Sequence, residues 1–225
     1  FFDPMLTRIL SALVMAPLAF AAIWFGFPYF EFMVSVVGVL AALEWQRLIS
    51  SNGPQPQSWV WLIAGALYIL LPCLILIWLR GIDNQGRQII IWLFAVIWAS
   101  DIGAYFSGKS IGGQKMAPII SPNKTWAGFI GGLVLACVTG LILNNYTEPS
   151  FETSEIIIAS IILSIIGQFG DLLESWVKRT FQVKDSGTLI PGHGGVLDRI
   201  DAILLATPAA GLIVLFYEIG EVPWK

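Results

Sequence analysis

Long runs of apolar residues alternate with short polar segments along the whole chain. A helix needs about 20 consecutive apolar residues to cross a bilayer, and windows of that length predict seven spanning helices. The predicted helices cover residues 9–27, 29–45, 59–79, 88–107, 126–144, 155–176 and 202–218. The first run, which begins at Ile9, is long enough to be a true span rather than a cleaved signal peptide. The pattern therefore predicts an all-α fold, a polytopic transmembrane helical bundle of about seven spans.

Composition agrees with a bilayer as the solvent of this chain. The 225 residues are 56% hydrophobic and only 12% charged, whereas soluble domains carry roughly 25% charged residues. Cys73 and Cys137 both lie in apolar runs and the chain has one His, so neither a disulfide framework nor a zinc site is expected. Residues 1–225 are predicted to form a single integral membrane domain, with N-terminal helices in 1–94 and a catalytic core segment in 95–205. No nucleic-acid partner is expected.

The placement of Lys and Arg predicts the orientation. Threading the helices alternately puts nine cations on one side of the membrane, namely Arg8, Arg47, Lys109, Lys115, Lys124, Lys178, Arg179, Lys184 and Arg199. Three lie on the other side, namely Arg80, Arg87 and Lys225. Because loops rich in Lys and Arg stay inside the cell, the first side is predicted to be cytoplasmic and the N-terminus to lie inside. Both long polar loops, 107–126 and 177–201, then face the cytoplasm.

Several acidic residues lie inside or at the ends of predicted spans, where an unpaired charge costs roughly 3 kcal/mol. Asp101 lies well inside the fourth span, either as a polar plug bonded to a neighbouring helix or as a functional group. Asp171 and Glu174 are three residues apart near the end of the sixth span, so they share one helix face. Asp198 and Asp201 repeat that spacing at the start of the seventh. Two carboxylate pairs therefore bracket the second polar loop.

These carboxylates predict a metal site. Mg²⁺ prefers hard oxygen ligands and recruits substrate phosphates to complete its coordination. The alternative is a salt-bridge network that only closes the helix ends. The cations available for such a network are Lys178, Arg179, Lys184 and Arg199.

A glycine-dense stretch, Pro191-Gly-His-Gly-Gly195, leads into the last carboxylate pair. Backbone N–H groups at Gly194 and Gly195 can approach an anion closely, and the following helix start also favours phosphate. These features predict a nucleotide site, with an ordinary flexible hairpin as the alternative. His193 is expected to position substrate rather than to act as a general base.

The first polar loop offers a second set of phosphate-binding groups. Ser121, Lys124 and Thr125 stand at the mouth of the fifth span. The alternative is a Pro-containing helix start followed by an interfacial Trp126.

Two further patterns in this region are assigned to other roles. Residues 103–110 satisfy the phosphate-loop pattern G-x-x-x-x-G-K-[ST], but that motif works only between a strand and a helix. We reject a phosphate loop here, although Lys109 can still touch phosphate at the membrane surface. Gly128 and Gly132 have the GxxxG spacing of close helix packing or of a dimer seam, so a homodimer stays open.

The polar residues of the second loop resemble a known signature. Ser175-Trp-Val-Lys178-Arg179, Lys184-Asp185-Ser-Gly187 and Pro191-Gly-His-Gly-Gly-Val-Leu-Asp198-Arg199-Ile-Asp201 fix more than a dozen residue types over 27 positions. This pattern is similar to that of phosphatidate cytidylyltransferases, also called CDP-diacylglycerol synthases. Segments 101–109 and 121–128 resemble the same family, whereas the N-terminal third resembles it only in hydropathy and in Glu44-Trp45.

The resemblance implies transfer of a cytidylyl group from CTP to phosphatidic acid, giving CDP-diacylglycerol and pyrophosphate in phospholipid biosynthesis. It implies a bacterial cytoplasmic (inner) membrane protein whose site faces the cytoplasm and holds Mg²⁺ at two metal positions, the second of which can take a different cation. The expected metal ligands are Asp171, Glu174, Asp198 and Asp201. The expected catalytic residues are Asp171, Asp198, Asp201, Lys178 and Arg199. The expected substrate-binding residues are Asp101, Lys109, Ser121, Lys124, Thr125, Arg179, Lys184, Asp185, His193, Gly194 and Gly195.

Two other functions stay open at this point. One is a related CTP-dependent membrane lipid enzyme, either a polyprenol kinase or an archaeol-type cytidylyltransferase. The other is a transporter that uses Asp101 and Asp171 as proton or ion sites. A transporter leaves the His-Gly-Gly segment unexplained.

Overall fold

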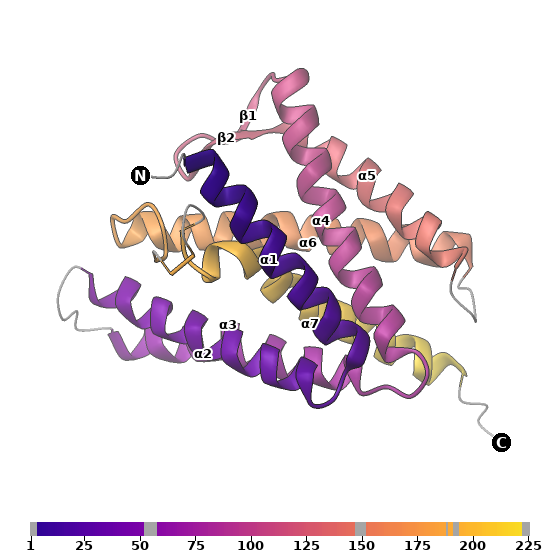
Figure 1. Ribbon diagram of the computed structural model, residues 1–225. Helices are drawn as coiled ribbons and strands as arrows, with labels where there is room; N and C mark the ends of the chain where they lie inside the picture. The colour runs from indigo at the N-terminus through magenta and orange to yellow at the C-terminus, as the bar shows by residue number, and fades with distance from the viewer. Residues whose placement is uncertain (1–3, 52–57, 147–151, 188, 191–193, 222–225) are drawn as a thin grey trace. The chain divides into compact units, whose positions relative to one another are not determined.

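The computed structural model describes residues 4–51, 58–146, 152–187, 189–190 and 194–221, and the side chains of all of these except 4–12, 58 and 218–221. Helices dominate this part of the chain (Figure 1). They are α1 (Pro4–Phe25), α2 (Tyr29–Ser50), α3 (Ser58–Arg80), α4 (Gly86–Ser110), α5 (Trp126–Asn144), α6 (Thr153–Thr180) and α7 (Leu197–Glu221). Each coincides with one predicted span, so the predicted all-α class is confirmed.

Six of these helices, α2 to α7, are long and apolar enough to cross a membrane within the described residues. The protein is therefore an integral membrane protein. Leucines on α3 show why a bilayer is needed, because Leu67 is 64% exposed and Leu74 is 65% exposed, which would be costly in water. For α1 the described apolar part is Leu13–Phe25, so a seventh span stays a prediction, as does the orientation.

The helices that border the second polar loop are longer than predicted. α6 continues to Thr180 and α7 already begins at Leu197. Apolar windows find the part of a helix that lies in hydrocarbon, whereas backbone hydrogen bonding continues into the polar interface. Lys178 therefore lies on α6, and Asp198 lies in the first turn of α7, rather than in the loop between them.

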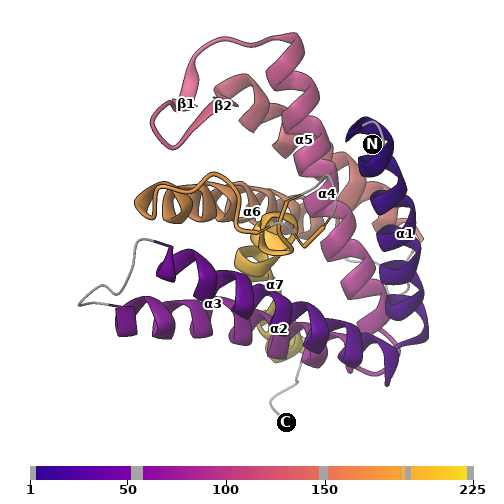
Figure 2. The ribbon, with the colours of Figure 1, turned by 60° about the vertical axis from the view of Figure 1, so that its left-hand side comes forward.

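A small hairpin lies between α4 and α5, where only a polar loop was predicted (Figure 2). Strand β1 (Lys115–Ala117) pairs antiparallel with β2 (Ser121–Thr125), with Lys115 opposite Thr125 and Ala117 opposite Ser121. The strands are too short for an apolar and polar alternation to reveal them. The hairpin follows residues 103–110, which lie within α4. The rejection of a phosphate loop is therefore confirmed, since no strand precedes that pattern among the described residues.

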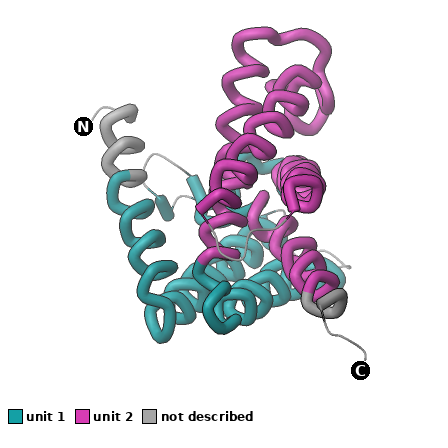
Figure 3. The backbone as a smooth tube through the Cα atoms, turned by 90° about the vertical axis from the view of Figure 1, so that its right-hand side faces the viewer, with its two compact units in different colours: residues 1–87, 173–201 teal, residues 88–172, 202–225 magenta. Residues whose placement is uncertain are grey.

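Contacts divide the chain into two compact units (Figure 3). Unit 1 contains residues 1–87 and 173–201, which include α1 to α3, the end of α6 and the start of α7. Unit 2 contains residues 88–172 and 202–225. The predicted single membrane domain stays a prediction.

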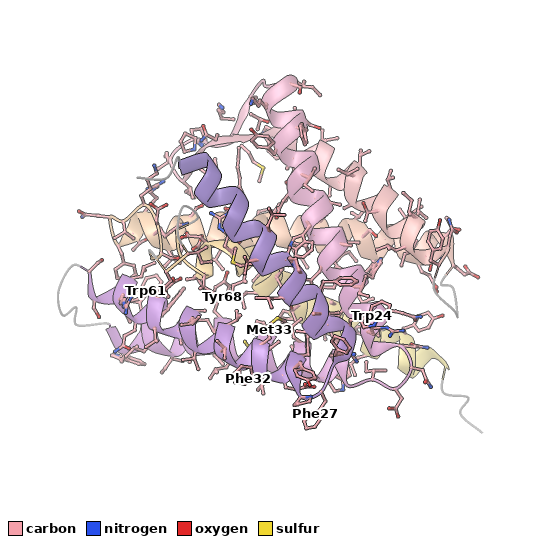
Figure 4. All side chains as sticks on the ribbon, in the orientation of Figure 1. Trp24, Phe27, Phe32, Met33, Trp61 and Tyr68 are labelled. Carbon is pink, nitrogen blue, oxygen red and sulfur yellow. The ribbon has the colours of Figure 1, made fainter. Side chains whose placement is uncertain are left out.

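Within unit 1, polar side chains fix the ends of apolar helices. Arg80 of α3 donates from Nε to the Ile23 carbonyl at 2.9 Å, near the end of α1, where carbonyl groups lack helical partners. The Arg87 guanidinium lies 4.5 Å from the ring centre of Trp24, the α1 residue labelled in Figure 4. Just after the C-terminal end of α2, Ser51 Oγ donates to the Phe181 carbonyl at 3.3 Å. The last turns of α2 and α6 therefore lie together.

Within unit 2, glycines let α4 and α5 approach closely. A Cβ atom on Gly128 would lie 2.7 Å from the Ala104 carbonyl oxygen, and one on Gly132 would lie 2.9 Å from the Ser100 carbonyl oxygen. Both atoms belong to α4 of the same chain. The packing interpretation of this GxxxG pair is confirmed, while a homodimer stays a prediction.

Replacing Gly128 by alanine is expected to destabilise the protein by about 1–3 kcal/mol, because the backbone of α4 cannot rotate away from the added methyl group. Gly140 of the same helix is the matched control, since an added Cβ there meets chiefly the Ser160 side chain, which can rotate. Both changes bring the same gain in helix propensity. Thermal unfolding in detergent should show a lower midpoint for Gly128→Ala than for Gly140→Ala. Equal midpoints would contradict this explanation.

Candidate active site

An ion-pair cluster stands at the junction of α6 and α7 in unit 1. Lys178 Nζ lies 2.6 Å from Glu174 Oε2 and 2.6 Å from Asp198 Oδ1. The side chains are 11%, 1% and 9% exposed, respectively. Glu174 and Lys178 are four residues apart on α6, which puts them on one face. One cation therefore joins members of the two carboxylate pairs predicted from the sequence.

Asp198 also organises the backbone that leads into α7. Its Oδ2 accepts hydrogen bonds from Gly195 N at 2.9 Å and from Ser186 N at 3.1 Å. A carboxylate near a helix N-terminus satisfies N–H groups that lack helical partners and interacts favourably with the helix dipole. Gly195 N, which was predicted to bind substrate, therefore donates to a carboxylate of the protein, and its role in substrate binding stays a prediction. One turn on, Asp201 is 9% exposed and its carbonyl accepts a bond from Tyr68 Oη at 3.2 Å.

Glu44 of α2 contacts the backbone beside this cluster, and sequence reasoning did not include it among the site residues. It is fully buried, and its Oε1 accepts from Val196 N at 2.9 Å while its Oε2 accepts from Leu197 N at 2.8 Å. Ser186 Oγ donates to Oε2 at 3.2 Å. The signal that could have found it is the one applied to Asp101, a single acid within an apolar run.

Unit 2 contains a second, more open ion pair. Lys124 Nζ lies 2.7 Å from Asp171 Oδ2, with side chains 23% and 41% exposed. The same ammonium group donates to the Gln168 carbonyl at 3.2 Å. Thr125 is buried and caps α5, because its Oγ1 accepts a bond from Gly128 N at 3.1 Å. The structure thus joins Asp171 and Lys124 and gives Thr125 a structural contact.

Most of the other predicted site residues have more exposed side chains. Asp101 and Lys109 are exposed on α4, and Ser121 is half-buried on β2. Exposed side chains between or beside the last two helices are those of Arg179, Lys184, Asp185 and Arg199. Gly194 has φ +85°, a left-handed conformation that favours glycine. His193 lies outside the described residues.

A cavity of about 180 Å³ in unit 1 borders Glu174. The other lining residues are Trp45, Trp61, Ala64, Tyr68, Leu173, Trp176 and Val177. Figure 4 labels Trp61 and Tyr68, which come from α3. Glu174 Oε1 is buried without a hydrogen-bond partner among the described residues. A buried carboxylate oxygen without a partner is costly, so a proton or a cation is expected there.

The donors fit a divalent cation by their chemistry. Carboxylate oxygens of Glu174 and Asp198 converge on one ammonium group, and hard oxygen ligands are those that Mg²⁺ prefers. Among the residues that the structure describes, however, no group of three or more His, Cys, Asp or Glu side chains is assembled to hold a metal. The metal ligands therefore stay a prediction.

Comparison with known proteins decides the family. Residues 58–217 match the family model described as the Cytidylyltransferase family. The chain belongs to the cytidylyltransferase family. This match covers every site residue predicted from the sequence and excludes Glu44. Membership confirms the family predicted from the signature.

Relatives named phosphatidate cytidylyltransferase match most of this chain. The protein of Brucella suis is 43% identical over 192 residues, which are 85% of this chain and 66% of the relative. That of Rickettsia felis is 38% identical over 217 residues, or 93% of this chain and 90% of the relative. That of Bacillus subtilis is 44% identical over 143 residues, or 64% and 53%. The chain therefore spans just under two thirds of the Brucella relative.

Proposed function

We propose that this cytidylyltransferase transfers CMP from CTP to phosphatidic acid, giving CDP-diacylglycerol and pyrophosphate. The observation that carries the proposal is the buried cluster of Glu174, Lys178 and Asp198, in which two signature residues, Lys178 and Asp198, form an ion pair. Relatives that match up to 95% of the chain are named for this activity. A polyprenol kinase or a transporter would account for neither the signature nor the similarity to those relatives.

The reaction suits a site made of carboxylates and cations. An oxygen of the phosphate monoester attacks the α-phosphorus of CTP in line, and pyrophosphate leaves. The second pKa of a phosphate monoester is about 6, so this nucleophile is largely ionised at neutral pH. No strong general base is needed. Lys124, Lys178 and Arg199 are proposed to bind and orient the phosphate groups.

The proposed metal ligands are Asp171, Glu174, Asp198 and Asp201. Mg²⁺, when bound, neutralises charge on the phosphates of CTP. The protein's own part is to hold the carboxylates in one orientation, and the Lys178 ion pairs and the N–H bonds to Asp198 support that role. The second metal position is proposed to accept a different cation.

An interfacial site on the cytoplasmic side fits both substrates. The lipid stays in the leaflet while its headgroup meets a water-soluble nucleotide. Within unit 1, the ends of α2 and α6 and the start of α7 lie together, because Ser51 bonds to Phe181 and Glu44 bonds to Leu197. Alternate threading puts these three ends on the basic, cytoplasmic side. This supports the proposed location at the bacterial inner membrane.

Turnover of CTP labelled at its α-phosphate, with phosphatidic acid in mixed micelles, tests the function. Label is expected in a lipid product only when both phosphatidic acid and Mg²⁺ are present. An isoprenoid phosphate or a polyprenol in place of phosphatidic acid is expected to give no labelled lipid. Transfer from γ-labelled CTP would indicate a kinase, and counterflow in liposomes without CTP would indicate a transporter; either result would overturn the proposal.

A further inference from the structure

Glu44 lies far from the signature in sequence yet contacts it directly. It is 152 residues from Val196 and 153 from Leu197, and its carboxylate accepts a hydrogen bond from the backbone N–H of each. Ser186 Oγ supplies a third bond, to Oε2. Among the described residues, no Lys or Arg forms an ion pair with Glu44. N–H groups and the positive end of the α7 dipole therefore balance this buried charge.

The glycines of the signature leave room for this carboxylate. A Cβ atom on Gly187 would lie 2.5 Å from Glu44 Oε1, and one on Gly195 would lie 2.5 Å from Glu44 Oε2 and closer still to Ser186 Oγ. Real side chains do not approach so closely, and the carboxylate is held by its hydrogen bonds. Any larger residue at either glycine would displace Glu44 or the backbone. Glycine at these two positions leaves room for the Glu44 carboxylate and, at Gly195, also for the Ser186 hydroxyl that donates to it.

Glu44 and Asp198 both accept hydrogen bonds from Ser186 and from the segment 195–197. Ser186 donates its N–H to Asp198 Oδ2 and its hydroxyl to Glu44 Oε2. Gly195 N then bonds to Asp198, whereas the next two N–H groups bond to Glu44. The direction of the first turn of α7, and with it the direction of the Asp198 side chain, is thus coupled to α2.

We propose that Glu44 is a positioning residue, whose carboxylate ties α2 to the first turn of α7 and so sets the orientation of Asp198 for nucleotidyl transfer. This inference rests on the proposed function. Glu44 does not touch the reacting groups; it acts through Asp198. The carboxylate is needed because it offers an acceptor to two adjacent N–H donors and to a hydroxyl at once. A glutamine would turn an NH₂ group towards one of these donors.

Glu44→Gln in the full chain tests the inference against Glu31→Gln as a matched control. Glu31 is also on α2, and its Oε2 has no hydrogen-bond partner among the described residues. For Glu44→Gln, kcat is expected to fall about 10- to 100-fold, as for a small misplacement of a reacting group. The Mg²⁺ concentration for half-maximal activity is expected to rise, while the KM for phosphatidic acid stays near wild type. Glu31→Gln is expected to match wild type in all three.

The possible results distinguish a failure of the proposed function from a failure of the proposed role of Glu44. A wild-type protein without CTP-dependent activity would refute the proposed function. An active wild type together with a Glu44→Gln variant of unchanged kcat and unchanged Mg²⁺ requirement would refute the inference alone. A variant that only unfolds at lower temperature, with wild-type kcat per folded molecule, would also refute it.

If Glu44→Gln does not fold, Ser186→Ala decides. It removes one hydroxyl bond to Glu44 and leaves the backbone bonds in place. A several-fold fall in kcat with a thermal midpoint near wild type is expected. Wild-type kcat in Ser186→Ala would overturn the inference. If Glu44→Gln and Glu44→Asp both fold, Glu44→Asp should recover part of the activity lost in Glu44→Gln, because it restores the carboxylate on a shorter side chain.

Discussion

Replacing Asp198 by alanine is expected to lower the proposed CTP-dependent formation of CDP-diacylglycerol on the order of 1,000-fold. The change removes a proposed metal ligand, and it also releases the groups that Asp198 holds. Lys178 loses its 2.6 Å partner, and the N–H groups of Ser186 and Gly195 lose their acceptor. Loss of the ligand and loss of the local backbone geometry act in the same direction. The measurement is kcat/KM for CTP with the purified protein.

Two variants show whether this effect is specific. Asp198→Asn keeps the size of the side chain and one acceptor oxygen, so it should fold more like wild type while still losing most activity. Asp83→Asn is the matched control, because Asp83 is an exposed carboxylate in the turn between α3 and α4. It should retain wild-type turnover. An Asp198→Asn protein with wild-type turnover would remove Asp198 from the proposed metal ligands.

The helices could be predicted because a bilayer imposes a minimum length on apolar runs. Their polar ends could not. Lys178 and Asp198 follow and precede apolar windows, so hydropathy assigns them to a loop, although both lie on helices. The hairpin was not predicted either, because β1 has three residues and β2 has five. Strands this short are not long enough to show a regular alternation of apolar and polar residues.

Candidate site residues could be named from the sequence where they lie near one another in it. Spacings of three along a helix pointed to both carboxylate pairs, and the structure joins one member of each, Glu174 and Asp198, through Lys178. Glu44 follows no such rule. Its partners lie more than 150 residues away, and nothing local to α2 tells which segment a buried acid will contact. The sequence could indicate that Glu44 needs partners, whereas only the fold identifies them.

The glycine-dense segment and the start of α7 bind carboxylates of the protein. Closely spaced N–H groups were expected to bind phosphate. In the described part of this segment, the N–H groups of Gly195, Val196 and Leu197 bind the carboxylates of Asp198 and Glu44. A nucleotide site at these glycines stays a prediction. The protein's own side chains occupy these N–H donors, which preorganises the start of α7 without a ligand.

Replacing Lys178 by methionine is expected to destabilise the protein by about 3–5 kcal/mol, the usual cost of removing one partner from a buried ion pair. Methionine fills similar space, so the loss is mainly electrostatic. Glu174 is 1% exposed and Asp198 is 9% exposed, which leaves two nearby carboxylates without their shared cation. Thermal and denaturant unfolding in detergent measure the change. Lys115→Met, at an exposed position on β1, is the control and should shift stability by less than about 0.5 kcal/mol.

A second substitution separates charge from packing. Glu174→Gln in the Lys178→Met background removes one of the two unpaired carboxylates, so it should restore part of the lost stability, whereas Glu174→Gln alone should destabilise the protein. The coupling energy from this double-mutant cycle should be at least about 1 kcal/mol, since the two groups are in direct contact. Activity should not return in the double variant, because a proposed metal ligand and a proposed phosphate-binding cation are both missing. Additive effects on stability would show that the 2.6 Å contact between Glu174 and Lys178 contributes nothing to the fold.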